Sequence, residues 1–421
     1  MTKKSDAPAI RFKGFSDAWE QRKVGDLLIE RNQQAPMSDE YPLMAFIANE
    51  GVAPKGERYD RSALVTDTVN KLYKKTEKGD FIYSSNNLET GSIGLNKYGK
   101  ACISPVYSIF EPTGIADSDF LGRRLVRKDF INAMVKWRQG VIYGQWRIHE
   151  SDFLKIEITV PSVEEQRKIG TYLDQLDHLI TLHQRKFEKL TNVKKSMLEK
   201  MFPQNGSSYP EIRFKGFTDP WEQRKFDEVF DCTVPNNTLS RAELSYDEGT
   251  VLNVHYGDVL IKYGSVLDVQ KDDIPRIPHR CREDFNGALL QDGDVIIADT
   301  AEDETTGKAC EIGNLQGSAI VSGLHTMVCR PRNRMALGYL GYYLNSNAYH
   351  HQLLPLMQGI KVLSLSRSNI QKTSVSYPIA VKEQQLIAYY FSQLDNLITL
   401  HQRELEKLQN IKKSMLEKMF V

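Results

Sequence analysis

The sequence is poor in the features that mark secreted, membrane-bound or strongly charged proteins. Its five cysteines, Cys102, Cys232, Cys281, Cys310 and Cys329, include no Cys-x-x-Cys pair, which argues against a disulfide frame. The 55 lysines and arginines nearly balance the 54 aspartates and glutamates, so the formal net charge is only +1. Such a chain cannot attract a polyanion through its overall field. With no signal peptide at the start, these features predict a cytoplasmic protein.

Long hydrophobic runs are missing as well. The longest uncharged stretch, residues 336–360, contains asparagines, histidines, two glutamines and a proline, and is too polar to span a membrane. We expect it to form a buried amphipathic helix rich in tyrosine.

Catalytic motifs are also absent. The sequence has no Gly-x-x-x-x-Gly-Lys-Ser/Thr phosphate loop, no His-Glu-x-x-His zinc motif, no Asn/Asp-Pro-Pro-Tyr methyltransferase motif and no Gly-x-Ser-x-Gly elbow. Asp299, Glu302, Asp303 and Glu304 cluster in one segment, but no nuclease pattern follows them, and we interpret them as solvated loop charge. We therefore predict a binding protein with no catalytic residue, no cofactor site and no metal site of its own.

What the sequence does have is an internal repeat. The segment IRFKGFSDAWEQRK at 10–23 returns as IRFKGFTDPWEQRK at 212–225, with 12 of 14 residues identical. A longer segment, residues 163–202, returns at 381–420 with 28 identities in 40 positions. Between these repeats the two halves differ. The chain is therefore a tandem duplication with a constant frame and divergent inserts, for which a pseudo-twofold arrangement is expected.

The longer repeat has the pattern of a long helix. Pro161 and Ser162 give a start signal, and from Ile169 apolar residues recur at alternating spacings of four and three. Two such helices in one chain most simply pack on each other, and the duplication favours an antiparallel coiled coil. We interpret the histidine in each stripe as a register-setting polar residue, with a metal pair as the alternative. The predicted seam comprises Ile169, Leu173, Leu176, Ile180, His183, Phe187 and Leu190, and then Ile387, Phe391, Leu394, Ile398, His401, Leu405 and Leu408.

These patterns predict an α+β fold in which two mixed α/β domains are joined by two long helices. The expected order is a first domain with the aromatic box (1–160), a first helix (161–203), a linker (204–211), a second domain (212–378) and a second helix (379–421). In each domain the Phe-Lys-Gly-Phe box should hold the domain against the helices through its rings. These rings are Phe12, Phe15 and Trp19, and in the second copy Phe214, Phe217 and Trp221.

The inserts themselves are predicted to share a frame of strands. Gly-Asp turns precede strands at 81–83 and 295–297, and the segments 103–110 and 321–328 are predicted as a matching pair of strands. Each insert then passes through a Gln-Gly turn before its closing segment, at Gln139-Gly140 and at Gln358-Gly359.

The divergent segments carry side chains suited to reading DNA. Glutamine and arginine recognise adenine and guanine in the major groove, and aromatic rings stack on bases. Each segment alone is typical of an ordinary polar loop, but their shared position in the divergent parts of a duplicated frame indicates a ligand-binding surface. The candidate DNA-binding residues are Lys97, Tyr98, Lys100, Tyr143, Gln145, Arg147, Lys262, Tyr263, Arg280, Arg282, Thr305, Thr306, Lys308 and Arg367.

Over its whole length the chain resembles the specificity subunits of type I restriction-modification systems. Three motifs carry the resemblance: the Ile-Arg-Phe-x-Gly-Phe-x-Asp-x-Trp-Glu box at 10–20 and 212–222, a Pro…Glu-Gln step, and a Leu-Asp-x-Leu-Ile-x-Leu-His-Gln-Arg helix. The Glu-Gln step ends at Gln166 and Gln384, and the helix motif occupies 176–185 and 394–403.

The resemblance implies a function and a set of partners. It implies two target recognition domains that each read half of a bipartite site in double-stranded DNA, and helices that set the spacer and dock two methyltransferase subunits. It further implies recruitment of restriction and translocase subunits. S-adenosylmethionine, ATP and Mg²⁺ would then be used by those partners and not by this chain.

Two other classes of protein share some of these features. A bivalent coiled-coil scaffold carrying two protein- or sugar-binding modules would also have heptads and divergent heads. A self-sufficient methyltransferase or nuclease is disfavoured because the inserts lack cofactor motifs. A neighbouring gene that encodes an Asn-Pro-Pro-Phe/Tyr methyltransferase would favour DNA recognition.

Overall fold

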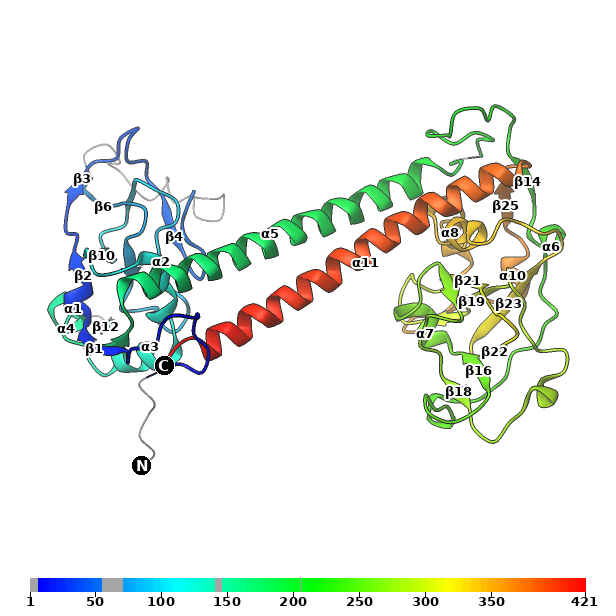
Figure 1. Cartoon of the computed structure of the whole chain (residues 1–421). Coiled ribbons are helices and arrows are strands. Elements are labelled where there is room, and N and C mark those ends of the chain that lie inside the picture. Colours follow the sequence, from blue (N-terminus) through cyan, green and yellow to red (C-terminus); the bar gives the residue numbers. More distant parts are fainter. Residues whose placement is uncertain (1–6, 55–70, 141–145, 205) are drawn as a thin grey trace. The chain divides into compact units, whose positions relative to one another are not determined.

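The computed structural model describes residues 7–54, 71–140, 146–204 and 206–421, which form two compact units. The first unit combines residues 1–183 with 404–421, and the second unit comprises residues 184–403. Each unit therefore contains one α/β head and one part of each long helix (Figure 1). Within the described residues, no helix has both the length and the hydrophobicity required to cross a bilayer.

The first head is built from short strands and short helices. A four-stranded sheet has the order β2-β10-β7-β8 and a three-stranded sheet the order β3-β6-β9, while β1 pairs with β13, β4 with β5 and β11 with β12. The strands are β1 (Glu20–Lys23), β2 (Leu28–Glu30), β3 (Gln34–Ala35), β4 (Ala45–Ile47), β5 (Gly51–Ala53), β6 (Tyr73–Thr76), β7 (Phe81–Tyr83), β8 (Ile93–Leu95), β9 (Ala101–Ile103), β10 (Ser108–Pro112), β11 (Gln139–Gly140), β12 (Trp146–Arg147) and β13 (Glu157–Val160). The helices are α1 (Val24–Leu27), α2 (Ser118–Arg124), α3 (Lys128–Val135) and α4 (Glu150–Phe153), followed by the long α5 (Val163–Lys200).

The core of this head is aromatic. Phe153 lies at its centre, with its ring centroid 4.6 Å from that of Phe110 and 4.9 Å from that of Tyr83. All three side chains are fully buried, and such ring pairs stabilise a core beyond their apolar area. Trp19 of the box joins the same core and packs against Phe120.

The second head has a larger central sheet. Its five strands have the order β15-β23-β19-β21-β17, a three-stranded sheet has the order β18-β16-β22, and β14 pairs with β25 and β20 with β24. The strands are β14 (Glu222–Lys225), β15 (Phe230–Asp231), β16 (Val251–Val254), β17 (Val266–Asp268), β18 (Arg276–Ile277), β19 (Val295–Ala298), β20 (Thr300–Ala301), β21 (Ala309–Gly313), β22 (Ala319–Ser322), β23 (Thr326–Pro331), β24 (Leu363–Ser364) and β25 (Ser374–Tyr377). The helices are α6 (Phe226–Val229), α7 (Tyr256–Ile261), α8 (Tyr339–Leu344), α9 (Asn347–His350), α10 (Arg367–Ile370) and the long α11 (Val381–Lys418), with 3-10 turns at Arg241–Glu243, Arg282–Phe285 and Leu354–Leu356.

The two heads share the frame that the repeat predicted. In each head the strand after the box pairs with the strand before the long helix, as β1 with β13 and β14 with β25. The predicted strands at 81–83 and 295–297 are β7 and the first residues of β19. β7 pairs antiparallel with β10, and β19 pairs antiparallel with β23.

Two predictions about local structure were wrong. The segments 103–110 and 321–328 are not single strands, because each ends one strand, turns and begins another. Pro105 lacks the N–H that a continuous ladder needs, and in the second head Gly323 and the left-handed His325 (φ 54°) make the turn. The stretch 336–360 is likewise not one helix but α8, α9 and a 3-10 turn that contains Pro355.

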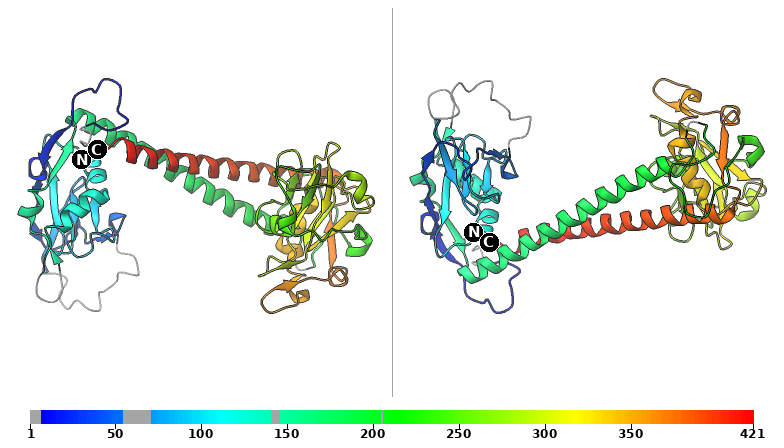
Figure 2. Two further views of the ribbon diagram at one scale, coloured as in Figure 1. Left: turned by 90° about the horizontal axis from the view of Figure 1, so that it is seen from below. Right: turned by 90° about the horizontal axis from the view of Figure 1, so that it is seen from above.

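The long helices pack antiparallel within each unit. In the first unit the start of α5 shares its core with the end of α11, through Leu173 and Met419 among others (Figures 1 and 2). In the second unit the end of α5 shares its core with the start of α11, where the rings of Phe202 and Phe391 stack with centroids 5.9 Å apart. Every residue of the predicted seam is buried or half-buried. The predicted fold class, two mixed α/β domains joined by antiparallel helices, is confirmed.

Candidate functional site

The aromatic box attaches each head to its long helix by the same contacts. In the first unit Arg11 donates two hydrogen bonds to the buried carboxylate of Glu165, Nε to Oε1 at 2.9 Å and Nη2 to Oε2 at 2.6 Å. In the second unit Arg213 binds Glu383 in the same bidentate way, at 2.7 and 2.9 Å. A bidentate pair between arginine and carboxylate fixes orientation as well as distance.

The rings of the box pack on the same helices, as predicted. Phe12 meets Tyr172 edge-on at 5.8 Å between centroids, and Phe214 meets Tyr390 at 6.3 Å. The ion pairs themselves were not predicted. The sequence carries their signal, because the arginine recurs in both boxes and the glutamate in both Glu-Gln steps.

A glutamine next to each of these glutamates ties the helix to its head. The Gln166 side chain accepts from the backbone N–H of Asp117 at 3.0 Å and donates to the carbonyl of Pro161 at 3.0 Å. Gln384 makes the corresponding bonds with Ala336 and Pro378, both at 2.9 Å. The frame of each head is therefore fixed to the helix by repeated residues, and the variable segments lie outside these attachments.

The 96–100 turn holds three of the candidate residues of the first head. Buried Asn96 organises the turn, because its Oδ1 accepts from the N–H of Tyr98 and its Nδ2 donates to the carbonyl of Gly99. This leaves Tyr98 47% exposed. Lys97 and Lys100 are also exposed but bind carboxylates, Lys97 with Asp174 at 2.7 Å and Lys100 with Glu40.

These ion pairs limit the charge that the turn can offer to a ligand. The hydrogen bond from Lys97 lowers the pKa of Asp174, which favours the ionised carboxylate. A phosphate or base approaching Lys97 must compete with this carboxylate. Tyr98 is the side chain of the turn that is most available for stacking.

The second candidate segment of the first head is only partly described. Tyr143 and Gln145 lie outside the described residues. Trp146 and Arg147 form β12 and are exposed, with the Arg147 guanidinium 3.8 Å from the Glu150 carboxylate. The N–H of Trp146 donates to Oδ1 of Asn86 at 2.6 Å, which anchors β12 to the turn after β7.

In the second head, burial separates the candidate residues into two groups. Tyr263 and Thr306 are buried, with 3% and 0% exposure, and the Nζ of Lys308 donates to the backbone carbonyls of Leu260 and Tyr263. Burial lowers the pKa of Lys308. The contacts described for these three side chains lie within the head.

The remaining candidates of this head lie at its surface: Lys262, Arg280, Arg282, Thr305 and Arg367. Lys262 is held by Asp273 at 2.9 Å, and Arg282 donates to the carbonyl of Gly317 at 3.3 Å. Their role in binding DNA stays a prediction.

The long helices carry a second, duplicated surface. Leu179 and Leu182 are exposed on α5 by 40% and 39%, and their repeats Leu397 and Leu400 on α11 by 43% and 52%. We call these four residues the paired leucines. Exposed large apolar residues that recur at equivalent positions in both units indicate a contact made twice.

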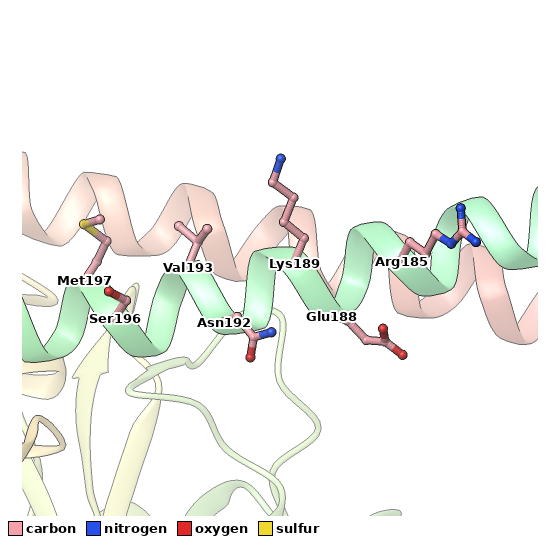
Figure 3. A pocket seen from close by; sticks show the side chains of 7 residues that line it. All are labelled: Arg185, Glu188, Lys189, Asn192, Val193, Ser196 and Met197. Carbon is pink, nitrogen blue, oxygen red and sulfur yellow. The ribbon is translucent and has the colours of Figure 1, made fainter. Parts of the chain in front are cut away.

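The surface of α5 is also hollowed in the second unit. Seven residues of α5, among them Arg185, Glu188 and Lys189, line a shallow hollow of about 520 Å³ (Figure 3). The residues 218 positions later are identical at six of these seven positions, with Val193 replaced by Ile411. The helix surface is thus constant where the heads are not.

Two unlike α/β heads are attached to the long helices through the same repeated residues, and one helix surface occurs twice in the chain. The chain belongs to the type I restriction modification DNA specificity domain family, whose model matches residues 16–192 and 218–410. It is 22% identical over 417 residues to the type I restriction enzyme MjaVIII specificity subunit of Methanocaldococcus jannaschii, covering 94% of this chain and 91% of that protein.

A solved structure shows the same fold. The S subunit of the type I restriction-modification system from M. genitalium matches with a TM-score of 0.53 and 14% identity, and the match covers 99% of each chain. The HsdS subunit from Thermoanaerobacter tengcongensis matches over 99% of each chain with 17% identity and a TM-score of 0.43. Membership of this family confirms the resemblance that the repeated motifs carried.

Proposed function

We propose that each head reads one half of a bipartite DNA site, so that this specificity subunit determines where a type I complex methylates and cuts. The observation that carries the proposal is a constant frame with divergent heads. Arg11–Glu165 and Arg213–Glu383 attach the two heads in the same way, while the loops around them share little sequence. Two different heads that are attached in the same way suit a DNA target with two different halves.

The chain would act without catalysis of its own, as its missing motifs predicted. Two methyltransferase subunits would dock on the duplicated helix surface and supply S-adenosylmethionine chemistry, and restriction subunits would supply ATP- and Mg²⁺-dependent translocation and cleavage. The charge of the second insert supports this division of labour. Residues 226–380 hold 13 lysines and arginines against 19 aspartates and glutamates, so partners must supply many of the phosphate contacts.

The long helices would set the spacer between the two half-sites. Helices α5 and α11 each contain 38 residues, and a helix of that length is roughly 57 Å long. Each unit contains one ion pair between the two helices, Lys412 with Asp177 and Lys194 with Asp395, which supports a defined pairing of the helices, as a ruler would require.

Exchange of one head tests the proposal. Residues 24–160 are replaced by the equivalent insert of another specificity subunit, and the chain is expressed with its methyltransferase subunits in a host without adenine methylation. Sequencing of methylated adenines in the host genome should show a motif with one half changed and the other half retained, because the frame residues remain in place.

The unaltered complex and the reciprocal exchange of residues 226–378 are the controls, and they should change opposite halves. A motif altered in both halves would contradict independent reading. Methylation without any motif in the unaltered complex would contradict DNA specificity itself and would favour a scaffold that binds other ligands.

A further inference from the structure

A short hairpin on the second head is built to project from its surface. Residues 358–364, called here the 358–364 hairpin, are closed by two backbone hydrogen bonds, from the N–H of Gln358 to the carbonyl of Ser364 at 3.0 Å and back at 2.8 Å. Gly359 has a φ of +129°, and a Cβ there would lie 1.9 Å from the carbonyl oxygen of Val362. The tight turn therefore requires glycine at this position.

The base of the hairpin is fixed to the head. Ser364 of β24 pairs with Thr300 of β20, and the N–H of Leu365 donates to the carbonyl of Asp299 at 2.8 Å. Leu365 is buried at 4% exposure. The hairpin thus has a defined orientation that its anchored base holds.

The tip of the hairpin is apolar and open to solvent. Ile360 is 100% exposed and Val362 51% exposed, so neither side chain contributes to the core. When a partner covers β-branched side chains at the tip of an anchored hairpin, no core contact is lost. Removal of their apolar surface from water then stabilises the complex.

The surrounding sequence favours a polyanion as that partner. No aspartate or glutamate occurs between Glu311 and Glu383, a stretch of 71 residues that holds seven lysines and arginines. Lys361 at the tip and Arg367 at the start of α10 are both exposed. The acidic residues of this head occur earlier in the chain, including Glu302 to Glu304 beside β20, and would keep phosphates away from that side of the hairpin.

The first head carries a pair of strands at the corresponding place in its fold. β11 and β12 pair with each other, and β12 is anchored to Asn86 just after β7. In the second head the anchor is Asp299, just after β19, the counterpart of β7. Trp146 of β12 is 50% exposed. Trp146 and Ile360 are therefore different large apolar side chains exposed at equivalent places in the two heads, as readers of two unlike half-sites should have.

We propose that the 358–364 hairpin is the base-reading element of the second head and enters the major groove of its half-site. The inference rests on the proposed function and names its contact surface. The major groove admits a two-stranded ribbon, in which Ile360 and Val362 pack on thymine methyl groups while Lys361 donates to guanine O6 or N7 or to a flanking phosphate. Arg367 then contacts the backbone beside the groove.

The test uses the full chain with its methyltransferase subunits in a host without adenine methylation. The variants Ile360→Asp and Lys361→Ala are compared with Ile379→Asp, a matched substitution at an isoleucine that is 67% exposed and lies outside the hairpin. We expect the hairpin variants to lower methylation of the target by about tenfold or more, or to relax one half of the motif, while the other half is retained. Ile379→Asp should leave both the motif and the rate unchanged.

Each other outcome overturns the inference in a distinguishable way. An unchanged motif and rate in both hairpin variants would show that the hairpin reads no base. Loss of the methyltransferase subunits from the purified variant complex, measured by native mass spectrometry, would assign the hairpin to a protein contact. If the unaltered complex methylates without a motif, the proposed function fails before the hairpin is tested.

Discussion

Glu311 is a buried acid whose ionisation opposes the folding of the second head. Its carboxylate accepts from the N–H of Gly341 in α8 at 2.8 Å, and its side chain is 1% exposed. Burial outweighs this hydrogen bonding and raises the pKa of Glu311 to about 7. In the unfolded chain the same carboxyl group has a pKa of about 4.3.

The pKa of Glu311 predicts a pH-dependent stability. Between about pH 4.3 and 7 the folded state holds a proton that the unfolded state has lost, so the free energy of unfolding falls as the pH rises through this window. The expected loss over this whole window is at most about 4 kcal/mol, from 1.36 kcal/mol for each unit of pKa difference. Urea denaturation from pH 5 to pH 8 measures it. Glu311→Gln should flatten the dependence, and Glu302→Gln, at an exposed site, should not; equal slopes in all three proteins would contradict the prediction.

At the residue scale, the candidate residues differ in their exposure. Lys97, Tyr98 and Arg367 lie at the surface as candidate ligand contacts should. Tyr263 and Thr306 were chosen by residue type and are buried, because Tyr263 packs in a hydrophobic core and Thr306 donates to the backbone carbonyl of Asp303. No local pattern distinguishes a loop tyrosine that faces solvent from one that fills a core.

At the element scale, two lysines that interrupt the helix stripes have matched partners. Lys412 lies 2.5 Å from Asp177 in the first unit, and Lys194 lies 2.5 Å from Asp395 in the second. The four residues are two repeated pairs, since Asp395 and Lys412 repeat Asp177 and Lys194. Polar partners at fixed positions within a seam select one register over the alternatives.

The register role predicts a measurable coupling between Lys194 and Asp395. In a double-mutant cycle with Lys194→Met and Asp395→Asn, the double variant should be destabilised by less than the sum of the two single variants. The expected difference, which is the coupling energy, is about 1 kcal/mol in urea unfolding. Exposed Lys186, replaced by Met with the same Asp395→Asn change, serves as the control and should show no coupling. Additive free energies for the Lys194 cycle would assign the pair no role in register.

The long helices were easier to predict than most of the short elements, although the short strands at 81–83 and 295–297 were found. The first helix, expected at 161–203, is α5, Val163–Lys200, because nearly forty residues of heptad pattern average out local exceptions. The stretch 336–360 was wrongly predicted as one helix because its apolar residues have helical spacing. In the structure the Asn345 amide donates to the backbone carbonyls of Ala309 and Gly341, and α8 ends there. A tertiary hydrogen bond of this kind leaves no periodic trace in the sequence.

At the scale of the whole molecule, the paired leucines predict how many partner subunits bind. Leu179→Glu with Leu182→Glu should remove one methyltransferase subunit, Leu397→Glu with Leu400→Glu should remove the other, and all four changes should remove both. The reason is that a charge placed in an apolar contact is costly to desolvate. Native mass spectrometry of the purified complex counts the subunits.

Tyr389→Glu is the matched control for this count. Tyr389 is 65% exposed on α11, but the equivalent position of α5 is Thr171, so this site is not duplicated. The control complex should retain both subunits. A four-fold leucine variant that still carries two methyltransferase subunits would place the docking surface elsewhere.

The repeated segments that attach the heads also have a consequence for how the gene of such a chain can evolve. Because the gene must encode almost the same fourteen residues at 10–23 and at 212–225, it contains two stretches at which strands from related genes can cross over in frame. A head inserted between a box and the following Glu-Gln step is flanked by an arginine and a glutamate that form the same ion pair in both units. If each head reads one half-site, as proposed, new target sequences can therefore arise by exchange of whole heads, and the attachment of the head to the long helices is retained in each exchange.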